Sequence, residues 1–325
     1  MDGKIALEEH YATEGLVDTA ESFLPGAKWP DLRARLLDIH DMRLAEMDRH
    51  GIEMTLLSLN APGVQAIPDT AEAIEVARIA NDELAESLAK RPDRFRGFAA
   101  LPMQDPEAAA NELTRAVRDL GFVGSLVNGF SEKDEAGTAV YYDGREYRPF
   151  WATMQELQAP LYLHPRSPVP FLATPYQGQP WLMGPAWAFA VETAVHVMRL
   201  IGSALFDDYP GLQIVLGHLG ERIPYDMARI DQRIEWSPMG YPCKKPVSAY
   251  MRENFHLTTS GNFNDPTFHC AIAEMGVSRL MFSVDYPFEQ MKEGAQWFDH
   301  TELSDADRLS IGRQNAIDLF KLKLE

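Results

Sequence analysis

The sequence is poor in cysteine, in basic residues relative to acidic ones, and in long apolar segments. Its 325 residues include only two cysteines, Cys243 and Cys270. Two thiols cannot build a disulfide framework or a cysteine-ligated zinc site. Unpaired thiols are typical of a reducing compartment, so we expect a cytoplasmic protein.

Acidic residues dominate the charge of the chain. There are 48 Asp and Glu residues against 30 Lys and Arg residues, and the formal net charge is −18. Because a nucleic-acid binder needs a basic surface, we expect no nucleic-acid partner. No run of about 18 apolar residues occurs, and residues 1–10 lack the apolar core of a signal peptide. We therefore expect no membrane association.

Eight short segments are predicted to be strands. Most are continuous apolar runs, as expected for parallel strands that are buried on both faces. The segments are Ile5–Glu8, Met54–Asn60, Arg96–Leu101, Ser125–Asn128, Leu161–His164, Leu212–His218, His256–Ser260 and Leu280–Asp285.

Helical patterns lie between most of these segments. Residues 31–51 have apolar residues at near-helical spacing and end at a glycine. Residues 105–121 begin with an Asp-Pro pair that suits a helix start and also end at a glycine. The predicted helices cover residues 31–51, 69–92, 105–121, 188–208, 221–236, 266–276 and 304–320.

Strands that alternate with helices predict an α/β fold, namely a (β/α)8 or TIM barrel, which we expect to form a single domain over residues 1–325. Internal repeats and low-complexity segments are absent. Two loop insertions, 11–30 and 165–185, follow the first and fifth strands, and the second contains six prolines. Both leave the carboxyl ends of strands, where the active sites of such barrels form.

Polar side chains gather at the carboxyl ends of the predicted strands. In a barrel these ends converge on one mouth. The residues are Glu8, His10, Asn60, Asn128, His164, His218, Ser260 and Asp285.

Four of these residues predict a metal site. Glu8 and His10 are two apart in an extended segment, so they project the same way and Glu9 faces away. With His164 and Asp285 they provide two imidazoles and two carboxylates, which suit zinc, manganese or iron and leave positions open for substrate. A single histidine at a strand end is more often a hydrogen-bonded loop residue, but the coincidence over several strands favours a metal.

A second polar group lies in residues 218–231. If Leu219–Arg222 turns into a helix, Glu221 lies one turn from His218 and can fix its tautomer while His218 exchanges a proton. The alternative is that Glu221 only stabilises the start of a helix. Arg229 could neutralise a substrate carboxylate, within or across subunits, or form a surface salt bridge.

Several motifs resemble the amidohydrolase superfamily and, more narrowly, its metal-dependent decarboxylases. These motifs are "ALEEH", "YLHPR", "LGHLGE", "TTSGNF" and "FSVDYPFE". Three more segments are similar to γ-resorcylate (2,6-dihydroxybenzoate) decarboxylases and their 2,3-dihydroxybenzoate relatives: "LSLNAPGVQAIPD", "GFVGSLVNGFS" and "IGRQNAIDLFKL". The resemblance covers essentially the whole chain, and the motifs are specific only when taken together.

The resemblance implies a role for each site residue. The metal ligands would be Glu8, His10, His164 and Asp285, and the catalytic residues Asp285, His218 and Glu221. The substrate-binding residues would be Phe23, Asn128, Phe130, Arg229 and Phe288. For Phe23 and Phe130, a role in the core is the alternative to an apolar pocket wall. The family also implies one divalent ion per subunit, Mn²⁺ or Zn²⁺ with Mg²⁺ possible, and a homotetramer or homodimer.

Some residues depart from the pattern of the family. Glu8-x-His10 stands where the hydrolases of the superfamily have His-x-His, and Asn128 stands where many have a metal-bridging lysine, so one metal is expected. Ala228 and Tyr286 stand where close resorcylate enzymes have tryptophan. Tyr286 is similar to the 2,3-dihydroxybenzoate enzymes, but those often have alanine in place of His10. The substrate isomer therefore stays open.

The implied reaction is the reversible, non-oxidative decarboxylation of an ortho-hydroxybenzoate. The first choice of substrate is 2,6-dihydroxybenzoate, with 2,3-dihydroxybenzoate or salicylate as alternatives. Protonation of the ring carbon before CO2 loss avoids an unstabilised aryl carbanion, and we expect Asp285 to supply this proton with help from His218 and Glu221. The alternative function is a metal-dependent hydrolase of a lactone, ester or amide.

Overall fold

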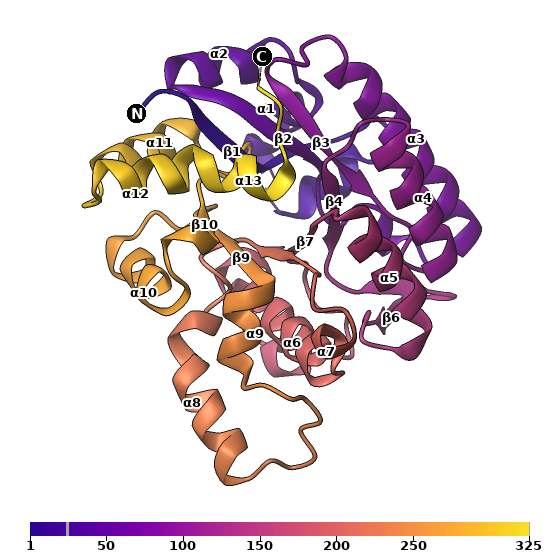
Figure 1. Cartoon of the computed structure of the whole chain (residues 1–325). Helices are drawn as coiled ribbons and strands as arrows, with labels where there is room; N and C mark the ends of the chain where they lie inside the picture. The colour runs from indigo at the N-terminus through magenta and orange to yellow at the C-terminus, as the bar shows by residue number, and fades with distance from the viewer. Residues whose placement is uncertain (24–25, 325) are drawn as a thin grey trace.

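Eight parallel strands form the centre of the molecule, in the order β1-β2-β3-β4-β7-β8-β9-β10, and helices surround them (Figure 1). The computed structural model describes residues 1–23 and 26–324 and shows the nearly closed TIM barrel predicted from the sequence. The barrel strands are β1 Lys4–Tyr11, β2 Ile52–Leu59, β3 Phe95–Ala100, β4 Gly124–Asn128, β7 Leu161–His164, β8 Ile214–Leu216, β9 Phe255–Thr258 and β10 Leu280–Met281.

The helices lie outside the strands, and α8 projects from the lower end of the view in Figure 1. They are α1 Trp29–Leu37, α2 Met42–Arg49, α3 Thr70–Leu88, α4 Pro106–Arg118, α5 Arg148–Leu157, α6 Ala188–Gly202, α7 Leu205–Asp208, α8 Ile223–Trp236, α9 Val247–Asn254, α10 Asp265–Met275, α11 Met291–His300, α12 Asp305–Leu309 and α13 Asn315–Phe320. The segment Ser310–Gln314 is a π-helix that joins α12 to α13.

Shorter elements occupy the loops. A hairpin of β5 Ser131–Lys133 and β6 Glu135–Val140 follows β4, where no strand was predicted. The 3₁₀ turns are Val17–Phe23, Gly26–Lys28, Gly63–Ala66, Arg145–Tyr147, Thr174–Tyr176, Pro180–Leu182, Gly184–Ala186 and Val277–Arg279.

The eight predicted strands are confirmed, but two predicted helices are wrong as single elements. Residues 31–51 form α1 and α2, because Asp38 is extended and its Oδ1 accepts the Arg43 N–H at 3.0 Å, which gives the chain a local alternative to a continuous helix. Residues 188–208 form α6 and α7, and Ala204 between them has a positive φ of 60°. Helices α5, α9 and α11 were not predicted.

Alternate side chains of the strands fill the interior of the barrel. Helix α13 adds Ala316 and Phe320 to the same cluster and so closes the end away from the strands' carboxyl termini. The strand residues are Ile5, Leu7, Met54, Leu56, Phe98, Leu126, Tyr162, Val215 and Met281.

A β-bulge in β1 changes which side chains face inward. Ala6 pairs with Thr55 of β2 and Glu9 pairs with Leu57. Between these pairs β1 advances by three residues while β2 advances by two. Bulges of this kind redirect side chains and are common at barrel rims. Leu7 can therefore belong to the apolar interior while Glu8 also points into the barrel.

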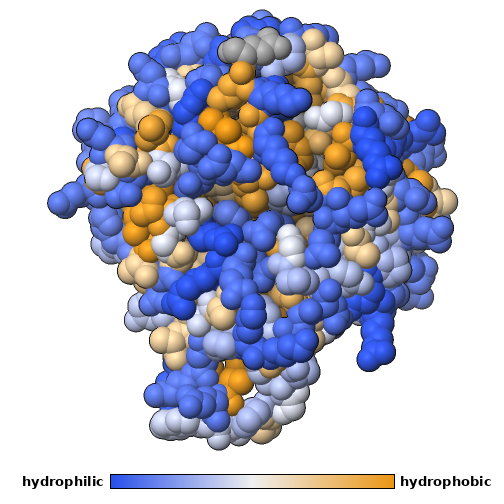
Figure 2. Space-filling view, viewed as in Figure 1, coloured by the Kyte–Doolittle hydropathy of each residue, from blue (hydrophilic) through white to orange (hydrophobic). Residues whose placement is uncertain are grey.

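The face shown in Figure 2 is largely hydrophilic, with apolar side chains in separate small patches. Among the described residues, no helix is both long and apolar enough to span a bilayer.

The start of α4 offers a test of the local stability. Asp105 Oδ1 accepts the N–H groups of Glu107 and Ala108 at 2.9 and 3.0 Å. Because Asp105→Ala removes this cap, we expect it to lower the free energy of unfolding by about 1 kcal/mol. Asp105→Asn keeps a hydrogen-bond acceptor, so it should lower the free energy of unfolding much less. Urea unfolding followed by circular dichroism measures both, and equal losses would contradict the capping role.

Candidate metal centre

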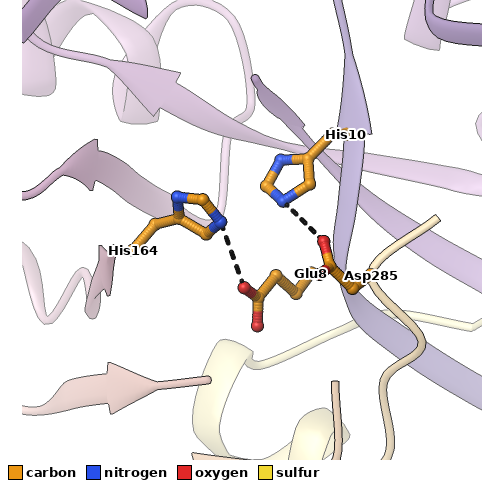
Figure 3. A group of neighbouring side chains, drawn as sticks. All are labelled: Glu8, His10, His164 and Asp285. Carbon is orange, nitrogen blue, oxygen red and sulfur yellow. Dashed lines mark ion pairs between the residues drawn. The ribbon is translucent and has the colours of Figure 1, made fainter. Parts of the chain in front are cut away.

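The barrel brings the four predicted metal ligands together at its mouth. Glu8 and His10 come from β1, His164 from the end of β7, and Asp285 from the loop after β10 (Figure 3). One potential ligand atom from each lies within 4.8 Å of the others. Three of the residues are buried and Asp285 is partly buried. The spacing fits one cation rather than two.

The contacts among these residues test whether a cation fits. His164 Nε2 lies 3.3 Å from Glu8 Oε1, and His10 Nε2 lies 3.2 Å from Asp285 Oδ1. Within the described part of the chain, Glu8 Oε1, His10 Nε2 and Asp285 Oδ1 are buried atoms without a hydrogen-bond partner. Buried polar atoms are rarely left so, because each loses its contact with water. A divalent cation between them would satisfy all three.

Glu8 is held by hydroxyl groups on its other oxygen. Glu8 Oε2 accepts hydrogen bonds from the hydroxyls of Tyr162 and Ser260, and Thr258 Oγ1 lies 3.4 Å away. Burial disfavours the charged form, but the neighbouring histidines, His218 first, outweigh it and hold the pKa of Glu8 well below its ordinary value. Glu8 is therefore an anion, which suits a metal ligand.

His10 is oriented from behind by β2. Its Nδ1 lies 3.1 Å from Ser58 Oγ, which leaves Nε2 directed at the ligand cluster. Burial lowers the pKa of His10, although Asp285 opposes this effect. A neutral imidazole with one nitrogen anchored and the other free is the usual form of a histidine ligand.

His218 and Glu221 form the predicted pair, but by a different backbone route. His218 Nδ1 lies 2.7 Å from Glu221 Oε1, and His218 Nε2 lies 3.6 Å from Asp285 Oδ2. The expected helical turn over Leu219–Arg222 is wrong, because α8 begins at Ile223 and all residues from 218 to 222 have positive φ. Left-handed backbone costs roughly 1–2 kcal/mol for each residue other than glycine. Only the surrounding fold can hold such a turn.

The protonation of His218 follows from its surroundings. Burial disfavours the charged ring, but the negative charges of Glu221 and Glu8, the nearby Asp285 carboxylate and the hydrogen bond to Glu221 raise the pKa of His218 well above its ordinary value. His218 can therefore carry a proton next to Asp285.

A small cavity of about 220 Å³ opens beside the ligand cluster. A second cavity of about 420 Å³ shares Pro185, Phe189 and His218 with it. The walls of the first combine apolar side chains with potential proton carriers, as expected for the site of a small aromatic molecule. Its lining residues are Ala61, His164, Pro185, Phe189, His218, Asp285, Phe288 and Glu289.

The predicted substrate-binding residues lie in different places. Phe288 lines the small cavity, and its ring lies 5.8 Å from that of His10. Asn128 and Phe130 are buried outside the cavity lining, and the Arg166 guanidinium lies over the Phe130 ring at 4.3 Å. Arg229 is exposed on α8.

The substrate-binding roles of these residues stay predictions, because their positions alone do not test them. The side chain of Phe23 lies outside the part of the chain that the structure describes. For Phe130, the buried position agrees with the core role that was the alternative.

Sequence reasoning missed several residues that shape the site. Tyr162 stands two residues before His164 on the same strand, and this spacing places both on one face, so the period of the strand could have revealed it. Ser58 could have been found in the same way, since it lies two residues after Leu56 of the interior cluster. The cavity walls Pro185, Phe189 and Glu289 come from loops and helix starts, where no such period exists.

Comparison with known proteins gives one consistent family. The family model described as Amidohydrolase matches residues 17–322. γ-Resorcylate decarboxylases from Polaromonas sp. strain JS666 and Rhizobium sp. strain MTP-10005 are 57% and 56% identical to the chain, over 99% of both sequences in each case.

Solved structures agree with this result. A 2,6-dihydroxybenzoate decarboxylase in complex with 2,6-dihydroxybenzoate has a TM-score of 0.97 and 56% identity, covering 99% of this chain and 100% of the other. A dihydroxybenzoic acid decarboxylase from Polaromonas sp. strain JS666, with bound manganese and the inhibitor 2-nitroresorcinol, has a TM-score of 0.97 and 57% identity, covering 99% and 97%.

The packing of Gly217 against Glu8 yields a test of the ligand geometry. A Cβ at Gly217 would overlap Glu8 Oε2 and lie 3.0 Å from Oε1. We therefore expect Gly217→Ala to displace the Glu8 carboxylate and weaken Mn²⁺ binding by about 10–100-fold. Gly202→Ala is the control, because a Cβ there meets nothing within 4 Å. Isothermal titration of the metal-free proteins measures both, and wild-type affinity in Gly217→Ala would contradict this geometry.

Proposed function

The chain belongs to the amidohydrolase family, and we propose from this premise that it is a Mn²⁺-dependent decarboxylase of 2,6-dihydroxybenzoate. The observation that carries the proposal is that a cavity of about 220 Å³ is lined both by two of the predicted metal ligands, His164 and Asp285, and by His218, the predicted proton carrier. The γ-resorcylate decarboxylases, 56–57% identical over the full length, support the substrate class.

In the proposed reaction, some residues of the site would bind the metal and others would bind the aromatic ring. A divalent cation held by Glu8, His10, His164 and Asp285 supplies Lewis-acid stabilisation of negative charge on substrate oxygens. Phe288 and Phe189 provide apolar walls for the ring and limit the entry of water.

Proton transfer then depends on Asp285 and His218. Asp285 gives its proton to the ring carbon that bears the carboxylate. The bond to the carboxylate carbon breaks, CO2 leaves, and the electron pair of that bond restores the aromatic ring. His218, 3.6 Å from Asp285 Oδ2, returns a proton to Asp285, and Glu221 stabilises the charged imidazole at 2.7 Å.

Substitution of Asp285 tests this assignment. We expect Asp285→Asn to lower kcat at least about 100-fold, because the amide cannot deliver the proton. The assay measures CO2 and resorcinol released from 2,6-dihydroxybenzoate by the Mn²⁺-loaded protein, with 2,3-dihydroxybenzoate and salicylate in parallel. The exposed Asp318→Asn on α13 is the control.

Two results would overturn the proposal. One is near wild-type turnover by Asp285→Asn, and the other is no CO2 from any of the three acids. The same ligands would also allow hydrolysis, so water labelled with ¹⁸O separates the two reactions: a hydrolase places the label in an organic product, whereas the decarboxylase releases resorcinol without it.

The surface between α6 and α8 supports a further part of the proposal, a homotetramer or homodimer. A groove of about 670 Å³ between these helices is lined largely by apolar residues, and Trp187 and Val195 are 42% and 45% exposed there. Contiguous exposed apolar surfaces often mark interfaces between chains. Arg229 is exposed on α8, so assembly through this surface would bring it near a second copy, which would favour a role across subunits over the predicted alternatives, a role within one subunit or a surface salt bridge.

The assembly can be tested by a charge on this surface. Val195→Glu should reduce the molar mass measured by light scattering after gel filtration, because a buried unpaired carboxylate opposes association. Ile79→Glu on α3 is the matched control, since Ile79 is 47% exposed and lies elsewhere. A wild-type mass that remains an oligomer in Val195→Glu would contradict the use of this groove.

A further inference from the structure

The barrel has a seam between its first and last strands. β1 and β10 stand at the two ends of the strand order, and β10 comprises only Leu280 and Met281. Among the described residues, no strand ladder joins β1 to β10. The chain after β10 leaves the extended conformation, because Asp285 has a φ of 81°, and it cannot form a regular ladder there.

Glu9 bridges this seam with its side chain. Its Oε1 accepts the Val284 N–H at 2.9 Å, and its Oε2 accepts the Tyr286 N–H at 3.1 Å. The carboxylate therefore binds the backbone on both sides of Asp285. These two N–H groups would otherwise be buried without an acceptor, which destabilises a folded protein.

Two further contacts fix the same segment. The Ser283 hydroxyl lies 3.2 Å from Glu9 Oε1, and its oxygen accepts the Glu8 N–H at 2.6 Å. The His10 N–H donates to the Tyr286 carbonyl at 2.7 Å. The bonds of Glu9 thus connect the segment of β1 that carries two predicted ligands to the loop after β10 that carries the ligand Asp285.

The charge of Glu9 is balanced inside the protein. The Val284 and Tyr286 N–H groups donate to its two oxygens, and the positive charge of Arg43 favours the carboxylate. Both oxygens of Glu9 face donors, which fits the ionised form. Arg43 is fully buried, lies 4.8 Å from the centre of the Tyr286 ring and donates to the His10 carbonyl, so it supports the same segment.

We propose that Glu9 is a positioning residue that replaces the missing ladder at the seam and holds Asp285 in place to bind the metal. Glu9 lies between Glu8 and His10 but contacts the backbone of the opposite strand end instead of the cation. Three consecutive residues of β1 thus provide two of the predicted ligands and hold the third, Asp285, in position. The catalytic consequence rests on the proposed function, but the metal affinity does not.

Mn²⁺ affinity in a double-mutant cycle tests this role. Glu9→Gln keeps the size of the side chain but places an amide N–H₂ against a backbone N–H. We expect it to weaken Mn²⁺ binding about 10–100-fold. In the Asp285→Asn background the same substitution should change affinity less than about 3-fold, because the positioned carboxylate is already lost.

Two further variants complete the design. Glu192→Gln is the matched control, because Glu192 is also buried and accepts a hydrogen bond, from Tyr141, but lies on α6; it should bind Mn²⁺ like wild type. Glu9→Asp keeps the charge near Arg43 and shortens the reach by one methylene, so it decides the question if Glu9→Gln does not fold. We expect it also to bind Mn²⁺ more weakly.

The proposal is overturned if folded Glu9→Gln or Glu9→Asp binds Mn²⁺ with wild-type affinity. It is also overturned if Glu9→Gln weakens binding equally with and without the Asp285 carboxylate, since that would indicate a general structural effect. Binding is measured without substrate, so a failure of the decarboxylase assay leaves the result interpretable.

Discussion

The structure depends on the burial of one negative charge, that of Glu8, in the floor of the barrel mouth. A carboxylate with no exposure is costly unless hydrogen bonds and positive charge compensate it. One oxygen receives the hydroxyls of Tyr162 and Ser260, and the other faces His164. Tyr162 also joins the apolar interior through its ring, so it links the packed barrel below to the polar site above. A cation at the unpartnered oxygen would complete the compensation.

Several residues of the site have backbone conformations that are locally unfavourable. Asp285 and the run from His218 to Arg222 have positive φ, although only Gly220 in that run is a glycine. Such strain persists where the surrounding structure over-determines it and is concentrated at active sites. Here the anchors are visible: the Leu219 N–H donates to the Thr258 carbonyl at 2.8 Å, and the His218 N–H to Ser260 Oγ at 3.1 Å. The strand next to the turn therefore holds His218 and Glu221 in place.

Predictions from the sequence were accurate where a repeating pattern carried the information. Continuous apolar runs located all eight barrel strands, and the two-residue period of β1 separated Glu8 and His10 from Glu9. Predictions were weaker where a side chain competes with the backbone for hydrogen bonds. The Asp38 side chain accepts an N–H at the start of α2, and one predicted helix is divided into two there. The bulge in β1 was also invisible, because it exists only in the pairing with β2.

The sequence by itself determined the fold class, the family and the set of polar residues at the strand ends, because these follow from patterns along the chain. The tertiary structure decided how those residues meet. It placed His164 and Asp285 close to the ligands of β1. It brought His218 and Glu221 into contact through a left-handed turn of the backbone, and it placed the Val284 N–H across the seam where Glu9 accepts its hydrogen bond. It also placed Phe130 in the core and Arg229 on the surface. Contacts between residues hundreds of positions apart depend on strand register and loop course, which no local pattern specifies.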